Sequence, residues 1–196
     1  MNRLIIGLVG CLALYIQPGV AQGLRLLGQI GRSSYGSMAI GGLGTGGGSD
    51  QEWKVGTIVG LGVRFQTSHN PTFDGIIEYS IHSFQSVSGG AEPTNDPKNK
   101  IVEFAILARF NIDIAGPVRL SLFPGISPYY QLKDDRVYSN PAYNSKGESR
   151  FGVGGVVGAG FSVECSSVVD LYLDGSLRMR SYITPVIELG IALRID

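Results

Sequence analysis

The stretch IVEFAILARFNIDI, residues 101–114, alternates between two kinds of side chain along its whole length. From Val102 to Ile114, the residues at every second position are, in order, Val, Phe, Ile, Ala, Phe, Ile and Ile. The residues between them are Glu103, Ala105, Leu107, Arg109, Asn111 and Asp113. Because successive side chains of a strand point to opposite faces, this period of two predicts a β-strand with one apolar face and one mixed, charged face.

The composition narrows the class of protein. The chain has 196 residues, enough for one domain, and its formal net charge of +0 gives no electrostatic indication of a nucleic-acid partner. Beyond the N-terminus, no run approaches the roughly 18 apolar residues of a membrane-spanning helix. The mean hydropathy is nevertheless +0.15, so the apolar residues must be spread over shorter segments.

The N-terminus has the three parts of a secretory signal peptide. A short basic head that ends at Arg3 precedes the apolar run LIIGLVGCLALYI (4–16), and PGVA (18–21) is a small-residue cleavage site. We therefore expect residues 1–21 to be cleaved and residues 22–196 to form a single domain. Removal of Cys11 would leave Cys165 without a disulfide partner, so something other than a disulfide must stabilise this exported chain.

The period of two recurs in further segments and predicts eight strands. Their expected ranges are 24–43, 53–66, 73–86, 101–114, 117–132, 150–164, 168–180 and 185–195. Long polar connections (44–52, 87–100, 133–149) alternate with short ones (67–72, 115–116, 165–167), and only 181–185 is short where a long one is due. Alternating long and short connections are typical of an up-and-down meander, so we expect an all-β, eight-stranded antiparallel barrel.

In the second to eighth predicted strands, one face is uncharged and the opposite face is assigned seven bases and seven acids. The charged set is Lys54, Arg64, Arg109, Arg119, Arg178, Arg180 and Arg194 with Glu78, Glu103, Asp113, Glu164, Asp170, Asp174 and Glu188. A soluble lipocalin-like barrel would turn the apolar face inward, and a membrane barrel would turn it outward to lipid. Equal numbers of both signs favour an enclosed, paired network, because an unpaired buried ion costs several kcal/mol.

Aromatic residues on the apolar face favour the membrane barrel. Trp53, Phe104, Tyr130 and Phe151 are expected at the long-loop ends of their strands, and Phe65, Phe73, Phe110 and Phe161 at the short-turn ends. The separation of the two groups is roughly 25–30 Å along the axis of a tilted barrel, which matches the apolar thickness of a bilayer. An eight-stranded barrel is filled by its own side chains, so the interior should be a plug and not a wide channel.

The signal peptide, the eight alternating strands and the last strand with apolar residues at every second position resemble the OmpA/OmpX-like superfamily of small outer-membrane β-barrels. The resemblance covers nearly all of residues 22–196. It implies an outer membrane of the Gram-negative type, lipopolysaccharide as a neighbour, and insertion by the barrel-assembly machinery. Such strands usually end in an aromatic residue, whereas GIALRID ends in Ile195 and Asp196.

Candidate catalytic and cofactor motifs are few. Glu78, Ser80 and His82 share one face of a strand and offer an acid, a nucleophile and a base, but residues two apart on a strand are separated by roughly 6.6 Å. GLGTGG (42–47) has the glycine spacing of a dinucleotide-binding turn, but no helix-forming sequence follows it. No Cys/His set has metal-ligand spacing, so we expect no cofactor or metal.

The leading hypothesis is a non-enzymatic outer-membrane barrel with a structural or surface-interaction role through its long loops. The loop 133–149 mixes charges with two tyrosines, a composition suited to contacting a partner or surface sugars. Three alternatives stay open: a lipid A-modifying enzyme, a narrow pore, and a soluble ligand-binding barrel.

Overall fold

Nearly all of the described chain is β-strand. The computed structural model describes residues 21–33, 51–53, 56–67, 70–86, 93–180 and 183–195. The strands are β1 (Ala21–Ser33), β2 (Gln51–Trp53), β3 (Gly56–Thr67), β4 (Thr72–Ser86), β5 (Lys98–Ala115), β6 (Val118–Lys133), β7 (Ser149–Glu164), β8 (Val169–Met179) and β9 (Ile183–Ile195), with one short 3-10 turn, η1 (Pro141–Tyr143). Among the described residues, no helix is long and apolar enough to cross a membrane.

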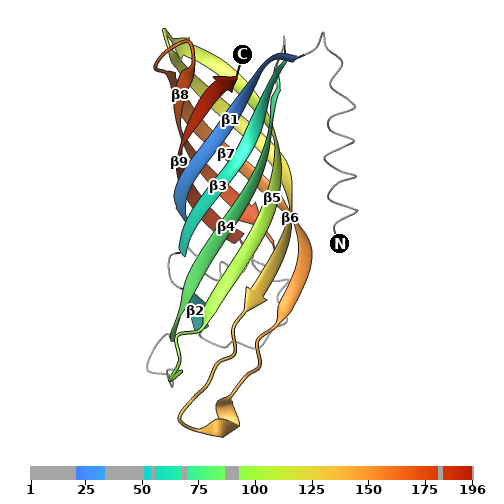
Figure 1. Ribbon diagram of the computed structural model, residues 1–196, viewed down its shortest axis with the longest axis vertical. Coiled ribbons are helices and arrows are strands. Elements are labelled where there is room, and N and C mark those ends of the chain that lie inside the picture. The colour runs from blue at the N-terminus through green and yellow to red at the C-terminus, as the bar shows by residue number, and fades with distance from the viewer. Residues whose placement is uncertain are drawn as a thin grey trace.

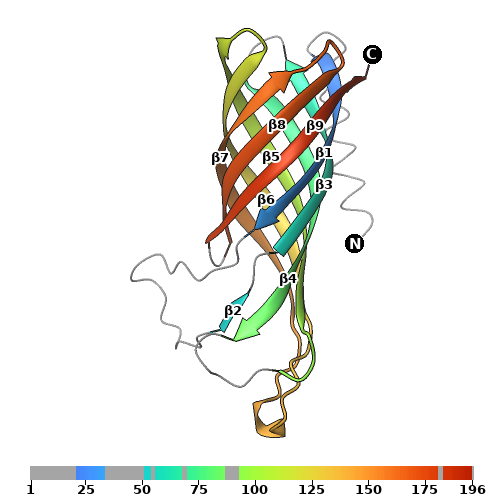
Figure 2. The same ribbon diagram turned by 90° about the vertical axis from the view of Figure 1, so that its left-hand side faces the viewer.

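The strands close into a barrel (Figures 1 and 2). Each strand of the wall is antiparallel to its neighbours along the chain. The first strand, β1, pairs with β3 on one side, where Leu24 is opposite Phe65, and with the last strand, β9, on the other, where Leu24 is opposite Ile195. β2 pairs with β4 beyond the last β3–β4 pair, so eight strands form the closed wall. The predicted eight-stranded, antiparallel, up-and-down barrel is confirmed.

The two ends of the barrel differ in their connections. At the short-turn end, strands are joined across 68–71, 116–117 and 165–168, and β1 begins and β9 ends there. At the opposite end, which we name the loop end, 34–50, 87–97, 134–148 and 180–182 join the strands. As Figure 1 shows, β4 to β7 run beyond β1, β3, β8 and β9 at the loop end. Residues 149–154 of β7 pair with β6 alone, because the last β7–β8 pair is Gly155 with Met179.

Several predicted boundaries were wrong. β1 begins at Ala21 and not at residue 24, and the second half of the predicted range 24–43 lies outside the described residues. The predicted strand 53–66 corresponds to β2 and β3, which begin at Gln51 and end at Thr67, with residues 54–55 outside the described part. β5 begins at Lys98 and not at residue 101, because its polar first residues pair with β4, in the register Ser83 with Lys98. Backbone pairing extends a strand past its apolar residues, which alternation alone does not reveal.

The wall distributes its side chains in the opposite way to a soluble protein. Leu61, Phe151, Val153 and Ile187 on the outer face are 74%, 69%, 65% and 64% exposed, whereas charged side chains on the inner face are almost fully buried. A soluble monomer rarely exposes a continuous apolar surface of this extent. The arrangement contradicts the lipocalin-like alternative, which needs the apolar face inside.

Candidate functional site: the charged interior and the two barrel ends

Six charged side chains form the short-turn cluster, which we define as Arg25, Arg64, Asp74, Arg109, Asp170 and Asp174. Asp74 accepts two hydrogen bonds from Arg64, at 2.7 and 2.8 Å, and a third from Arg109 Nε at 3.0 Å. Arg109 also donates to both carboxylate oxygens of Asp174, at 3.1 and 2.6 Å. Arg25 pairs with Asp170. Three guanidinium groups therefore meet three carboxylates, and each acid contacts at least one base.

Five charged side chains form the loop-end cluster, which we define as Glu78, Glu103, Arg178, Arg180 and Glu188. Arg178 donates to Glu78 and to both oxygens of Glu188, at 3.2 and 3.1 Å, and Arg180 pairs with Glu103. Here two bases face three acids. Some buried polar atoms at this level have no hydrogen-bond partner in the described chain, among them Nε of Arg178 and Nδ2 of Asn99.

An apolar layer lies between the two clusters along β4 and β5, whereas Asp174 and Glu188 of the two clusters are direct partners in the β8–β9 register. Leu27, Ile76, Leu107, Phe123 and Val156 are each at most 5% exposed and belong to one packed group. Tyr172 and Gln29 connect the levels: the tyrosine hydroxyl donates to Gln29 Oε1 at 3.0 Å, and Gln29 Nε2 donates to Glu78 and Glu188 at 2.7 and 2.9 Å. The interior is thus filled by side chains, as expected for eight strands.

Most of the predicted interior charges lie in these clusters, but the prediction misassigned one end of the barrel. Asp113 was predicted inside, yet its side chain is 87% exposed, because β5 and β6 extend past the rim where it pairs with Arg119 at 3.3 Å. Arg119 and Glu164 are partly exposed, at 29% and 33%, and Arg194 is half-buried. Lys54 lies outside the described residues.

The prediction also missed two members of the short-turn cluster. Asp74 shares the inward parity of Glu78 and could have been found from alternation. Arg25 was missed because the predicted set of interior charges covers the second to eighth strands and includes no residue of the first, whose second part, 31–44, alternates poorly. Neither residue's partner could be read from the chain, since Arg25 and Asp170 are 145 residues apart.

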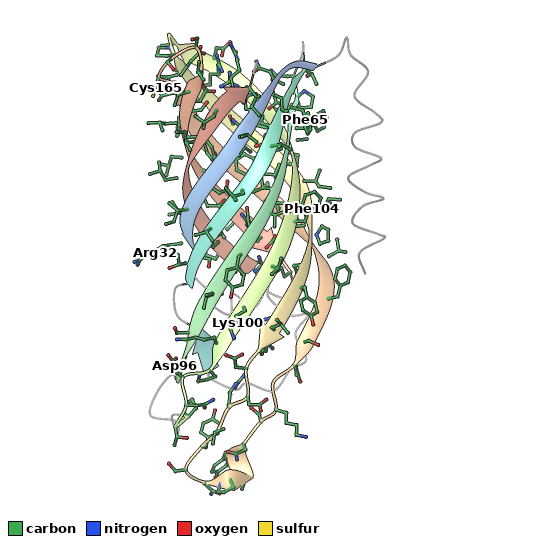
Figure 3. All side chains as sticks on the ribbon, viewed as in Figure 1. Arg32, Phe65, Asp96, Lys100, Phe104 and Cys165 are labelled. Atoms are coloured by element: carbon green, nitrogen blue, oxygen red, sulfur yellow. The ribbon has the colours of Figure 1, made fainter. Side chains whose placement is uncertain are left out.

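The predicted interface aromatics divide into three groups. Phe73, Phe110 and Phe161 near the short-turn end, and Tyr130 and Phe151 near the loop end, have exposed side chains on the outer wall. Phe65 and Phe104 are half-buried. Figure 3 shows Phe104 well inside the length of the barrel and not at its loop end, because β5 begins earlier than predicted. The side chain of Trp53 lies outside the described part.

Glycines on the inner face leave space for the clusters. A Cβ on Gly160 would lie 1.9 Å from Asp174 Oδ1, and one on Gly158 would lie 2.3 Å from the ring of Phe123. Arg109 lies over that ring, with its guanidinium carbon 4.4 Å from the ring centroid. The glycine-rich segment 151–161 therefore makes room for interior side chains.

The candidate catalytic set has a different geometry from the predicted one. His82 Nε2 lies 3.3 Å from Ser80 Oγ and 3.3 Å from Ser33 Oγ, so these side chains lean together despite their spacing along the strand. Glu78 instead bonds to Arg178 and Gln29. His82 is fully buried. In the described chain, no three His, Cys, Asp or Glu side chains are placed to hold a metal ion.

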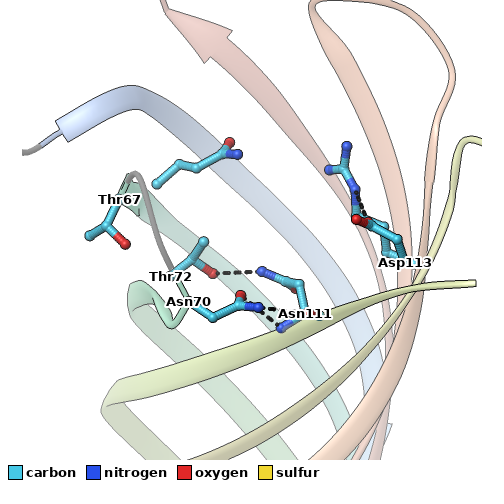
Figure 4. Close-up of a pocket in the computed structure, with 7 residues that line it drawn as sticks. Thr67, Asn70, Thr72, Asn111 and Asp113 are labelled. Carbon is cyan, nitrogen blue, oxygen red and sulfur yellow. Dashed lines mark hydrogen bonds and ion pairs between the residues drawn. The ribbon is translucent and has the colours of Figure 1, made fainter.

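A polar cavity of about 250 Å³ opens at the short-turn end (Figure 4). Its lining includes Gln66, Asn70, Asn111, Asp113 and Arg119. A second pocket of about 20 Å³, which we name the inward extension, shares Gln66, Thr72, Asn111 and Arg119 with the cavity and is also lined by Arg25, Arg64 and Asp170 of the short-turn cluster.

The comparisons with known proteins agree on the fold. No protein-family model and no curated protein match the sequence. Among solved structures, Neisserial surface protein A is similar with a TM-score of 0.58 and 13% identity, over 89% of this chain and 99% of that one. Ail, the attachment invasion locus protein of Yersinia pestis, in complex with the heparin analogue sucrose octasulfate, is similar with a TM-score of 0.54 and 15% identity, over 88% of this chain and 99% of that one.

The fold is therefore that of the small eight-stranded outer-membrane barrels, as the resemblance predicted. At these identities the similarity establishes the architecture.

Proposed function

We propose that this chain is an integral outer-membrane barrel whose apolar wall faces lipid. The observation that carries this proposal is the inverted distribution of side chains, with exposed leucine, isoleucine and phenylalanine outside and paired charges inside. The outer-membrane barrels of similar fold support the location. Insertion by the barrel-assembly machinery and contact with lipopolysaccharide follow from it.

Cell fractionation followed by gel electrophoresis tests the location. We expect recovery in the outer membrane, and a mobility shift between unheated and boiled samples, because a closed barrel stays compact in detergent until it is heated. Recovery as a soluble periplasmic protein would contradict the proposal.

The role that we propose is surface interaction, without catalysis, through a rigid projection at the loop end. We name residues 127–154 the tongue. Within it, Arg136 and Ser145 form a β-bridge. The segment 93–97 is fastened to it: Thr94 N donates to Val137 O at 2.7 Å, and Asn95 exchanges bonds with Asp135 O and Val137 N at 2.7 and 2.9 Å.

This fastening supports a binding role because a preorganised surface loses little conformational entropy when it binds. The tongue also presents exposed side chains suited to contact, including Tyr143, which is 64% exposed, and the exposed bases Lys146 and Arg150. The similar structure of Ail holds a heparin analogue. We therefore propose sulfated or phosphorylated glycans as the partners of the tongue.

Salt elution of the folded barrel from immobilised heparin tests the partner. We expect Lys146→Gln to elute at lower salt than the unaltered protein, because each lost ion contact weakens a screened electrostatic attraction. Arg194→Gln is the matched control, since it removes one base at the opposite end. Equal elution of both variants would contradict an anionic glycan as partner.

A second candidate function is a lipid A-modifying activity, favoured by the closeness of His82 to two serine hydroxyls. Mass spectrometry of lipid A from cells with and without the protein tests it, with His82→Ala as the variant and Ser176→Ala as the control. A modification lost only in His82→Ala would replace the non-enzymatic proposal.

A third candidate, a narrow pore, would give steady conductance in planar bilayers that a heat-denatured control lacks.

A further inference from the structure

The cavity at the short-turn end has the features of a ligand site. Its volume of about 250 Å³ would hold roughly eight waters at their liquid volume. It is smaller than the roughly 300–1,000 Å³ of pockets that take drug-sized ligands. The cavity therefore suits a ligand of about one ring.

The charged side chains around the cavity already neutralise one another. Arg25 pairs with Asp170 at the inner end, and Arg119 pairs with Asp113 and with Glu164 at 3.3 and 2.7 Å. An incoming ion would have to displace one of these partners, at a cost in desolvation. A ligand without net charge avoids that cost.

The uncharged lining mixes donors with acceptors. Asn70 and Asn111 hold each other through backbone and amide groups, at 2.8 and 3.1 Å, and Asn111 Nδ2 donates to Thr72 Oγ1 at 3.2 Å, as Figure 4 shows. These bonds fix the wall in place. Gln66 lines both the cavity and its inward extension.

The inner end offers an acceptor that the described chain does not use. Asp170 is 3% exposed, and its Oδ1 atom has no hydrogen-bond partner, because Arg25 binds the other carboxylate oxygen. A buried carboxylate oxygen without a donor is costly, so the site favours a ligand that brings one. A hydroxyl group is a neutral donor and also an acceptor for guanidinium and amide groups.

From these features we propose that the short-turn cavity binds one neutral sugar ring, with a ring hydroxyl donating to Asp170 Oδ1 and others meeting Gln66 and Arg119. The site lies at the end opposite the tongue, so it is independent of the proposed surface interaction. Only the source of the sugar depends on the membrane location. Short turns on the periplasmic side would present the cavity either to soluble saccharides or to the glycan strands of the cell wall.

The test uses the full chain refolded in detergent micelles. N-acetylglucosamine is titrated while the backbone amide resonances of Asn111 and Thr72 are followed by NMR. We expect saturable shifts at these residues and none in the tongue. Gln66→Leu should weaken binding at least tenfold by removing the amide group that meets the ligand, and Asp170→Asn should weaken it by removing the charged acceptor.

Thr57→Leu is the matched control, because it places the same side chain on the same strand but on the exposed outer wall. It should bind like the unaltered protein. Unheated gel mobility confirms that each variant is folded. Absence of saturable shifts would overturn the proposal, as would equal binding by Gln66→Leu or equal binding of glycine or phosphate in place of the sugar.

Sedimentation with purified cell-wall sacculi identifies the source. Cosedimentation that N-acetylglucosamine competes away, and that Gln66→Leu loses, assigns the site to cell-wall glycan. Saturable binding of the free sugar without cosedimentation assigns it to soluble saccharides. Either result supports the site, and neither depends on whether the tongue binds heparin.

Discussion

The two charge clusters inside the barrel are built from the same residue types but have different balances. The short-turn cluster sets three arginines against three aspartates, with Asp74 shared between Arg64 and Arg109. The loop-end cluster sets two arginines against three glutamates, and polar atoms such as Arg178 Nε and Asn99 Nδ2 lack partners there. Among the described residues, every charge of the short-turn cluster has an opposite partner and only Asp170 Oδ1 lacks a donor, whereas the loop-end cluster has an excess acid and several atoms without partners.

The difference in charge balance indicates which part of the interior is more rigid. Bidentate arginine–carboxylate pairs between buried side chains hold neighbouring strands in a single geometry. An excess carboxylate with unpartnered donors nearby is usually satisfied by water, which exchanges and permits adjustment. We infer that the short-turn cluster is the rigid part of the interior, and that the loop-end cluster is hydrated.

Removal of Asp74 should be the most damaging single change. Asp74→Asn leaves Arg64 and Arg109 with one carboxylate fewer in a buried site, and breaking a buried pair costs about 3–5 kcal/mol. Urea unfolding of the barrel in lipid vesicles, followed by gel mobility, measures the loss. The control Asp96→Asn removes a carboxylate whose side chain is 71% exposed, and should change little. Equal losses would remove the distinction between buried and surface pairs.

A charge on the outer wall tests the proposed contact of that wall with lipid. Leu61→Lys should destabilise the barrel in vesicles by about 2–4 kcal/mol if Leu61 lies near the bilayer midplane. Thr57→Lys, four residues nearer the loop end on the same strand, should cost less, because the penalty falls toward the interface. The unfolding midpoints in urea compare the two, and a reversed order would contradict the placement of the membrane.

Overfilling the short-turn cluster should have an intermediate effect. Gly160→Ala puts a methyl group where Asp174 Oδ1 lies, and so displaces the carboxylate from Arg109. Overpacking typically costs about 1–3 kcal/mol. Gly175→Ala on β8 is the control, because its nearest atom, Ala159 O, would be 3.8 Å away. The same urea assay distinguishes them, and an unchanged Gly160→Ala would show that the cluster is less rigid than proposed.

Removal of the excess acid should have the smallest effect. Glu188→Gln leaves the loop-end cluster with two acids and two bases, and the amide oxygen of the glutamine can still accept a hydrogen bond from Arg178. We expect a change below about 1 kcal/mol, the usual size of one net hydrogen bond. A loss of unfolding free energy as large as that of Asp74→Asn would show that the two clusters depend equally on each of their carboxylates.

Individual residues show how far alternation carries a prediction. The inward parity of Glu78, Arg109 and Asp174 follows from period two alone, and all three are buried. Asp113 has the same parity but is exposed, because parity says on which side of a strand a residue lies and not whether the strand there is still enclosed. Phe104 was misplaced for a related reason, since the start of β5 depends on its pairing with β4.

Pairings between distant residues could not be predicted. Nothing local connects Arg25 with Asp170, or Gln29 with Tyr172, and these contacts depend on the closure of β1 against β9 and on the stagger of the strands. The apolar layer between the clusters was missed for the same reason. The closeness of His82 to Ser33 likewise arises from strands brought together by the barrel.

By itself, the sequence determined the strand count, the short and long ends, and which face is apolar, because these are properties of local alternation and turn composition. Only the tertiary structure decided which charges meet, how they divide into two clusters, and how the tongue is fastened to segment 93–97. Those features depend on the register in which the strands pair, and register is set by the whole closed barrel at once.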